Sequence, residues 1–178
     1  GVGYANPKQV KARPAPALNS LYQPAGNSVA GNPKGAITIV EFFDYNCGYC
    51  RLMYPNLKKL VAHDPSIRLV FREYPILSPR SILPAQAAIA AQKQGKYLAL
   101  HDAMLSAHAP LDKAEILRLA AEVGLNTAQL AKDMFSPAIV KQVQANLALG
   151  QSMNIQGVPS FMVARTNPPS TKPVEVVI

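Results

Sequence analysis

The residues with the clearest chemistry are Cys47 and Cys50, the two cysteines of the chain. They are three positions apart, so a disulfide between them closes a loop too short to restrain much of the unfolded chain. The pair is therefore poorly placed as a structural crosslink and well placed for a reversible dithiol–disulfide reaction. Gly48 and Tyr49 lie between them and adjust the hydrogen bonds and charges around the sulfurs without changing the ring closure.

The segments on either side of the cysteines predict how the pair is held. Residues 36–43 form a nearly unbroken apolar run of β-branched and aromatic residues, which favours a strand buried on both faces. Residues 51–62 carry apolar side chains at near-helical spacing, and residues 67–74 are typical of a second strand. This order predicts a βαβ unit with a parallel pair of strands.

In that arrangement Cys47 follows a buried strand and opens a helix. The unpaired backbone N–H groups and the positive end of the helix dipole then face its sulfur, which favours the thiolate. Cys50 lies one turn further along the same side of the helix, where it can close a disulfide with Cys47 or resolve a mixed one. We therefore expect Cys47 to be the reactive sulfur and Cys50 the resolving one.

The rest of the chain predicts helices enclosed between parts of one sheet. Residues 81–153 are Ala-rich, with four or five short helices expected, and residues 160–164 and 174–178 are typical of a β-hairpin. Several residues mark helix ends: capping boxes at Asp112 with Glu115 and Asn126 with Gln129, an N-cap at Ser136 before Pro137, and stops at Gly95 and Gly124.

The composition indicates a single globular domain. The chain has 178 residues, of which 49% are hydrophobic and 16% charged. Its formal charge is +8, but Lys and Arg are scattered and form no basic run with interleaved aromatics, so we expect a solvated surface and no nucleic-acid partner. No apolar stretch approaches the roughly 20 residues of a membrane-spanning helix. The chain begins with Gly1 rather than Met, so we expect a processed or trimmed form.

Two other interpretations of the cysteine pair are open. The pair could be half of a zinc site completed by His63, His101 or His108, but these histidines form no closely spaced pair, so we expect no metal. We expect the histidines to be on helix surfaces or packed in the core. Alternatively, the two cysteines are buried and inert.

A longer segment carries a resemblance to a known family. Residues 41–50, Glu-Phe-Phe-Asp-Tyr-Asn-Cys-Gly-Tyr-Cys, resemble the active-site segment of the DsbA-like thiol:disulfide oxidoreductases, especially their Com1-like bacterial branch. The resemblance extends to residues 31–35, Pro55, residues 94–97 and residues 157–159. It implies an α/β thioredoxin fold with an inserted all-helical subdomain. The expected parts are a Pro-rich N-terminal arm (1–35), the first half of the fold with the cysteines (36–75), the helical insertion (76–152), and a second half with the cis-proline loop and hairpin (153–178).

The resemblance also implies roles for residues outside the cysteine pair. It implies that the Val158–Pro159 bond is cis and faces the cysteines, where the exposed backbone can pair with a bound peptide. Glu41 matches an acidic position beneath the active site, where a desolvated carboxyl with a raised pKa can relay the proton of Cys50. The alternative is a strand-end Glu that reaches solvent. Pro55 matches a helix-kinking proline of thioredoxin-like proteins.

The function implied is that of a periplasmic or otherwise extracytoplasmic bacterial enzyme of protein folding, with no cofactor beyond its redox-active disulfide. It would oxidise reduced or misfolded secreted polypeptides and be reoxidised by a DsbB-like membrane partner. Tyr49 stands where oxidases of the family often have His, and the Gly48–Tyr49 pair resembles that of periplasmic disulfide isomerases. One alternative is therefore an isomerase or reductase kept reduced by a DsbD-like membrane partner.

The length of the N-terminal segment bears on that choice. Isomerases dimerise through a substantial N-terminal domain, and 35 Pro-rich residues are a poor candidate for one, so we favour an oxidase. A further alternative is a non-enzymatic extracytoplasmic binding protein with an inert disulfide. Relatives usually continue into a final helix on the sheet, so we expect that helix to be absent from this sequence or replaced by another cover.

Overall fold

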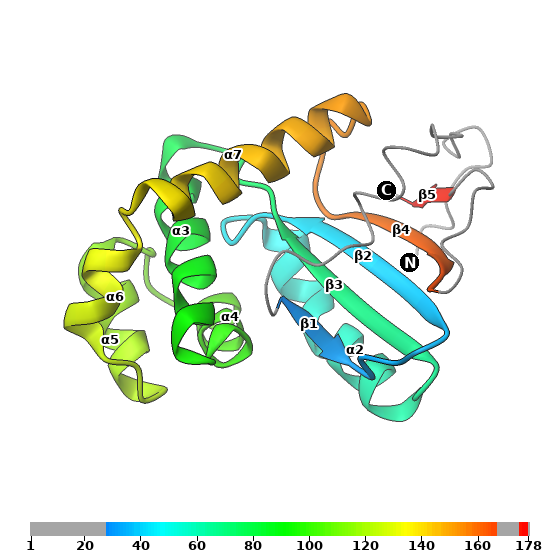
Figure 1. Ribbon diagram of the computed structural model, residues 1–178, viewed down its shortest axis with the longest axis horizontal. Helices are drawn as coiled ribbons and strands as arrows, with labels where there is room; N and C mark the ends of the chain where they lie inside the picture. The colour runs from blue at the N-terminus through cyan, green and yellow to red at the C-terminus, as the bar shows by residue number, and fades with distance from the viewer. Residues whose placement is uncertain (1–27, 167–174, 178) are drawn as a thin grey trace.

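The structure is a computed structural model that describes residues 28–166 and 175–177. Its central element is a five-stranded mixed sheet (Figure 1). The strand order is β1-β3-β2-β4-β5. β2 and β3 are parallel, as the βαβ prediction requires, and the other neighbouring pairs are antiparallel. The strands are β1 (Val29–Gly31), β2 (Ile37–Phe43), β3 (Ile67–Glu73), β4 (Ser160–Arg165) and β5 (Glu175–Val177).

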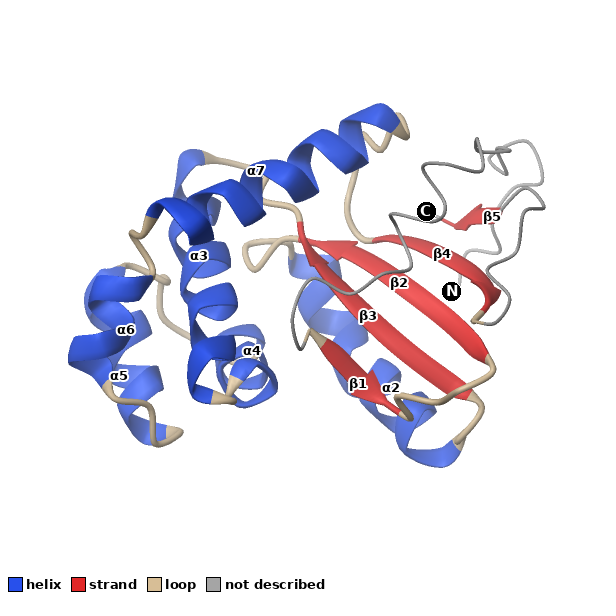
Figure 2. Cartoon of the chain, viewed as in Figure 1, coloured by secondary structure: helices blue, strands red, loops and turns tan. Residues whose placement is uncertain are grey.

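Six α-helices accompany the sheet in the described residues, and five of them lie between β3 and β4 in the chain. α2, which connects β2 to β3 in the chain, packs against the sheet. α3 to α6 lie beside the sheet, and α7 leads back to β4 (Figure 2). The α/β thioredoxin fold with a helical insertion is thereby confirmed. The helices are α2 (Gly48–His63), α3 (Ile82–Ala91), α4 (Tyr97–Leu105), α5 (Lys113–Glu122), α6 (Thr127–Asp133) and α7 (Pro137–Ser152), with short 3₁₀ turns at Pro79–Ser81 and Gln92–Gln94.

The helix ends follow the predicted caps, with one exception. Asp112 Oδ1 accepts the Glu115 N–H at 2.9 Å, and Asn126 Oδ1 accepts the Gln129 N–H at 2.9 Å. Ser136 occupies the N-cap position of α7, but its hydroxyl makes no cap hydrogen bond. The predicted stops at Gly95 and Gly124 coincide with left-handed backbone at the ends of a 3₁₀ turn and of α5.

β1 lies inside the segment that the sequence predicted to be an extended arm. Val29 pairs with Val70 and Gly31 with Arg68, so these residues add an edge strand to the sheet. A turn follows it, since the Gly35 N–H donates to Asn32 O at 2.9 Å. A Cβ on Gly35 would lie 2.7 Å from backbone atoms of Ser66 and Arg68, so this close approach requires glycine. Residues 1–27 of the predicted arm lie outside the described residues.

The two faces of the sheet pack into two apolar clusters. Along β2, Val40 and Phe42 point into the cluster that contains Tyr74 and Met162, and Phe43 points into the larger cluster of α2 and the helical insertion. Because strand side chains alternate between faces, Glu41 lies on the same face as Phe43, the face that α2 covers. The prediction of a strand buried on both faces is confirmed.

Candidate active site

Cys47 is the N-cap residue of α2. Its backbone is extended (φ −80°, ψ 112°), and its Sγ accepts the backbone N–H of Cys50 at 3.1 Å. The Cys47 N–H donates to Asp44 O at 3.0 Å, which closes a tight turn between β2 and the helix. The helix begins at Gly48, three residues before the predicted start, so Cys50 lies in its first turn. Cys47 therefore takes the place of the Ser or Asp that usually caps a helix, with its sulfur at the positive end of the dipole.

The two sulfurs differ in their environment. Both cysteines are free thiols, Cys47 being 6% and Cys50 2% exposed. Burial raises the pKa of the Cys50 thiol well above its ordinary value, its hydrogen bond with Cys47 raises it further, and the backbone of Asp44 opposes this effect. Cys50 is therefore held as a protonated thiol, which suits the resolving sulfur better than the attacking one.

Glu41 is buried beneath the cysteines. Its side chain is 3% exposed, so the alternative that it reaches solvent is wrong. Burial raises its pKa to about 8. Burial is the main cause of the raised pKa of the Cys50 thiol, and Glu41, when it is ionised, adds to that rise. A carboxyl that is largely protonated at neutral pH lies within electrostatic range of the buried sulfur.

The Val158–Pro159 bond is cis, as the resemblance implied, and faces Cys47. The Cys47 thiol donates to the Val158 carbonyl oxygen across 3.6 Å, although the two residues are 111 positions apart in the chain. The loop is anchored on both sides: the Tyr74 hydroxyl donates to Ile155 O at 2.7 Å, and the Ser160 hydroxyl donates to Gly157 O at 2.7 Å. The sheet and its loops therefore hold this backbone against the Cys47 sulfur.

Gly48 and Tyr49 lie at the surface of the site. A Cβ on Gly48 would meet nothing within 4 Å, and Tyr49 is 54% exposed. The surface around Gly48 and Tyr49 at the start of α2 is therefore open to a bound polypeptide. Their effect on the sulfur chemistry stays a prediction.

A buried polar network beside the site was not predicted. Glu73 Oε1 accepts hydrogen bonds from the hydroxyls of Tyr97 at 2.6 Å and Tyr45 at 3.1 Å, and the Tyr45 hydroxyl lies 2.7 Å from His101 Nδ1. Burial raises the pKa of Glu73 well above its ordinary value and lowers that of His101 to about 3, so His101 is neutral at pH 7. The only sequence signal was Glu73, an acidic residue near the end of the predicted strand 67–74.

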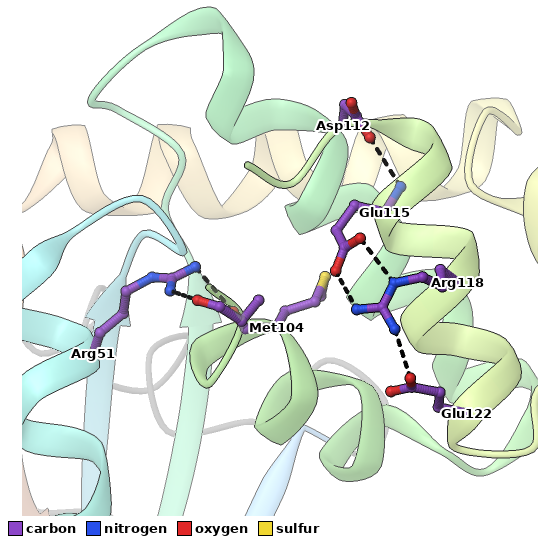
Figure 3. Close-up of polar contacts among 7 residues, drawn as sticks. Arg51, Met104, Asp112, Glu115, Arg118 and Glu122 are labelled. Atoms are coloured by element: carbon purple, nitrogen blue, oxygen red, sulfur yellow. Dashed lines mark hydrogen bonds and ion pairs between the residues drawn. The ribbon is translucent and has the colours of Figure 1, made fainter. Parts of the chain in front are cut away.

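Arg51 ties the start of α2 to the helical insertion. Its Nε donates to Tyr45 O at 2.8 Å, and its two terminal nitrogens donate to Ala107 O at 2.5 Å and Met104 O at 3.0 Å. Figure 3 shows the guanidinium directed at Met104 at the end of α4. The last carbonyls of a helix lack the regular intrahelical donors, so the arginine acts as a cap for α4. Arg51 thus fixes the turn that carries Cys47.

Two of the three histidines have other partners or positions. His101 belongs to the buried network, and His63 is at the far end of α2. Within residues 28–166 and 175–177, no group of three or more His, Cys, Asp or Glu is arranged to hold a metal ion. No helix in the same part of the chain is both long and apolar enough to cross a membrane.

The comparison with known families decides the assignment. The family described as the DSBA-like thioredoxin domain matches residues 38–175, which include the cysteine pair and the cis-proline loop. The chain belongs to the DSBA-like thioredoxin domain family. This is a family of thiol–disulfide oxidoreductases whose redox group is its pair of cysteines. The assignment to a Com1-like branch stays a prediction.

Solved structures of DSBA-like proteins have the same fold. A thioredoxin-like oxidoreductase from Silicibacter pomeroyi is 45% identical with a TM-score of 0.77, over 82% of this chain and 84% of that one. The catalytic domain of ScsC from Proteus mirabilis is 26% identical with a TM-score of 0.74, over 85% of this chain and 87% of that one. Both comparisons cover most of each chain, so the helical insertion is shared as well as the sheet.

Among curated proteins, the DSBA-like chain is similar to part of larger proteins. An Na⁺/H⁺ antiporter of Herminiimonas arsenicoxydans is 28% identical over 147 residues, and one of Salinispora tropica is 27% identical over 142 residues. The chain spans less than a quarter of the length of these relatives, 24% and 22% respectively. The likeness therefore concerns one segment of each antiporter.

Proposed function

We propose that this protein is a thiol:disulfide oxidase that introduces disulfides into secreted or periplasmic polypeptides through Cys47 and Cys50. The observation that carries the proposal is the position of the Cys47 sulfur, which lies at the N-terminus of α2 and against the Val158 carbonyl, with Cys50 buried one turn behind it. A sulfur at a helix N-terminus is a good leaving group as well as a good nucleophile. The fold thus supplies a disulfide that is easily reduced.

The reaction consists of two exchanges. In the disulfide form, a substrate thiolate attacks Cys47 Sγ, a substrate–Cys47 disulfide forms, and the Cys47–Cys50 bond breaks with its electron pair on Cys50. A second substrate thiolate then attacks the substrate sulfur of this mixed disulfide and releases Cys47 as a thiolate. The substrate loses two electrons and two protons, and the cysteine pair gains the two electrons.

Glu41 supplies the proton that the first exchange requires. The thiolate leaving on Cys50 is buried, and burial strongly favours its protonated form. A carboxyl with a pKa of about 8 is largely protonated at pH 7 and able to give up its proton, which suits a general acid. Glu41 recovers the proton from solvent between turnovers.

The backbone at Val158 orients the substrate. An extended segment that runs past Val158 can form strand-like hydrogen bonds with it, and these are independent of the substrate side chains. Such pairing places the substrate sulfur beside Cys47, because the Val158 carbonyl is 3.6 Å from Sγ. Gly48 and Tyr49 leave the approach open and offer one aromatic surface to the polypeptide.

The proposal includes a compartment and a partner. Disulfides persist in oxidising compartments, so the enzyme acts in the periplasm or another extracytoplasmic space of a bacterium. Each turnover leaves the pair reduced, and a DsbB-like membrane protein reoxidises it by passing on a disulfide of its own.

The test measures the reduction potential of the cysteine pair and compares the refolding of a reduced test protein with that of a scrambled one. We expect a reduction potential more oxidising than about −180 mV in glutathione buffers, the value of a protein disulfide isomerase. We also expect fast oxidative refolding of a reduced test protein and little recovery of a scrambled one. A lower potential with efficient unscrambling would show an isomerase instead, and refolding that is unaffected by Cys47→Ala would show a protein without this activity.

A further inference from the structure

A pocket of about 640 Å³ opens next to the active-site turn, and the mechanism above does not use it. Three segments meet there: the active-site turn, the start of the helical insertion, and the segment that leads into α5. We call it the Asn46 pocket, after the residue of the turn that lines it. The side chains that the argument uses are those of Asn46, Pro79, Arg80, Leu83, Leu111 and Lys113.

The Asn46 pocket is adjacent to the reactive sulfur but distinct from the cis-proline loop. Asn46 is the residue directly before Cys47, and its amide donates to the Ser81 hydroxyl at 3.2 Å. Asp44 joins the same two segments, because its carboxylate accepts the N–H of Asn46 at 2.8 Å and that of Leu77 at 3.0 Å. The described residues that line the pocket do not include Val158 or Pro159.

The Asn46 pocket carries two cations. Arg80 and Lys113 are exposed, and neither forms an ion pair with any residue in the described part of the chain. The Lys113 ammonium lies 5.6 Å from the centroid of the exposed Phe135 ring. Asp112 also lines the pocket, but its Oδ1 is engaged by the Glu115 N–H at the start of α5. The positive charge of Arg80 and Lys113 is thus available to a ligand.

Apolar side chains line the pocket together with the two cations. Leu83 and Leu111 lie in the lining together with Pro79. A side chain that fits here removes apolar surface from water, and a carboxylate next to it meets Arg80 or Lys113. The chemistry of the pocket therefore matches a short polypeptide segment with one acidic and one apolar residue.

We propose that the Asn46 pocket binds a segment of the substrate polypeptide that carries Asp or Glu beside an apolar residue, close to the cysteine that is oxidised. This inference rests on the proposed function. An extended chain covers about 3.3 Å per residue, so a carboxylate within about four residues of the substrate cysteine spans up to about 13 Å from Cys47. The enzyme thereby favours acidic sequences around the cysteines it oxidises.

The test uses three dithiol peptides that differ at one position, where they carry Glu, Gln or Lys three residues from the first cysteine. At low ionic strength, we expect the disulfide form of the protein to oxidise the Glu peptide at least threefold faster than the Gln peptide, and the Lys peptide most slowly. The ratio of the oxidation rate of the Glu peptide to that of the Gln peptide should fall toward one in 0.5 M salt, because exposed charges are screened. The same ratio is measured for the double variant R80E/K113E, where we expect it to drop below one.

Lys141→Glu is the matched control, since Lys141 is an exposed cation on α7 outside the pocket lining. It should keep the wild-type ratio. Two results would overturn the inference: equal rates for the Glu and Gln peptides with the wild-type protein, or a preference for the Glu peptide that survives R80E/K113E. In either case, oxidation of the Gln peptide would still uphold the proposed function.

A second measurement tests the Asn46 pocket without any redox reaction. Analogues of the peptides with Ser in place of Cys are titrated against the reduced protein by calorimetry. We expect the Glu analogue to bind at least threefold more tightly than the Gln analogue to the wild-type protein, and less tightly than the Gln analogue to R80E/K113E. Equal affinities would overturn this inference. A failure to oxidise any of the peptides would instead overturn the proposed function, so the two failures are distinguishable.

Discussion

The Cys50 thiol and the Glu41 carboxyl are two acids that the fold keeps out of water. Cys50 is behind the helix start, and Glu41 is under it on β2, so burial raises the pKa of each. The charge of one disfavours the charge of the other, as two negative groups in a low-dielectric site must. Two negative charges in this place are therefore disfavoured, which is the condition for the proton transfer from Glu41 to Cys50 that we propose.

Glu41 makes the stability of the protein depend on pH. Its pKa is about 8 in the folded protein and 4.5 in its ordinary state, so the folded form holds the proton more tightly. Stability is highest below about pH 4.5 with respect to this group, and is lost as the pH rises through 8. Glu41→Gln should remove this loss. As the pH rises between these two pKa values, the free energy of unfolding of the variant should increase relative to that of the wild type by up to about 1.4 kcal/mol per pH unit.

Urea unfolding at pH 5, 7 and 8.5 measures the effect. Parallel curves of the free energy of unfolding against pH for the wild type and Glu41→Gln would contradict the account. The same variant should also slow oxidation of a dithiol peptide near pH 7, because a side-chain amide at this position cannot give a proton to Cys50.

Tyr97 contributes to stability through its hydrogen bond with Glu73. Tyr97→Phe removes a 2.6 Å bond inside the core and leaves a buried carboxyl with one partner fewer, so we expect a loss of about 1–3 kcal/mol. Tyr49→Phe is the control, because this hydroxyl is on an exposed residue with no hydrogen bond inside the described structure. Chemical denaturation of both variants measures the difference, and equal stabilities would contradict a structural role for the network.

Single residues were predictable where the local pattern was specific. The cysteine pair, the cis proline and the buried Glu41 all belong to short segments that resemble the family, so the sequence led directly to them. Glu73 and His101 are far apart in the chain, and the hydroxyl of Tyr45 joins them only in the folded protein. No local pattern marks such a network, because each member on its own is an ordinary residue of a strand or helix.

α2 and α4 are joined by Arg51, and this connection determines how the active-site turn is held. One side chain binds three backbone carbonyls from two different segments, so the start of α2 cannot move without breaking bonds to α4. The sequence predicted a helix over residues 51–62 and four or five short helices within residues 81–153, but Arg51 looked like any first-turn arginine. β1 was missed for a related reason: three residues are too few to show a period of two.

Arg51→Met should destabilise the protein and loosen the site. It leaves the Tyr45, Met104 and Ala107 carbonyls without this donor, and we expect a loss of about 2–4 kcal/mol in the free energy of unfolding. Arg118→Met is the control, since Arg118 binds Glu115 and Glu122 on the exposed side of α5, as Figure 3 also shows. Exposed ion pairs contribute little, so its stability should barely change. Equal losses for both arginines would contradict the assignment.

The sheet and the helical insertion share one apolar core. The larger cluster contains Phe43 and Phe71 from the sheet, Leu57 from α2, and Leu100 and Ile116 from the insertion. The order of elements along the chain predicted the topology. It could not predict which face of α3 meets the sheet, because this Ala-rich helix is buried from Pro84 to Ala91 and shows no amphipathic period.

A shared core predicts cooperative unfolding of the whole molecule. Far-UV circular dichroism reports the helices, most of which are in the insertion, and near-UV circular dichroism reports the tyrosines packed beside the sheet. We expect the two signals to change in a single coincident urea transition. Two separated transitions would show that the insertion and the sheet fold as independent units.

The central claim is that Cys47 reacts and Cys50 resolves, and the rate of mixed-disulfide formation tests it most directly. Each single-cysteine variant, Cys50→Ser and Cys47→Ser, is mixed with a disulfide-bonded peptide at pH 7, and the adduct is followed by mass spectrometry. The account predicts that the thiol of Cys47 forms the adduct at least tenfold faster than that of the buried Cys50. Equal rates, or a faster adduct at Cys50, would contradict it.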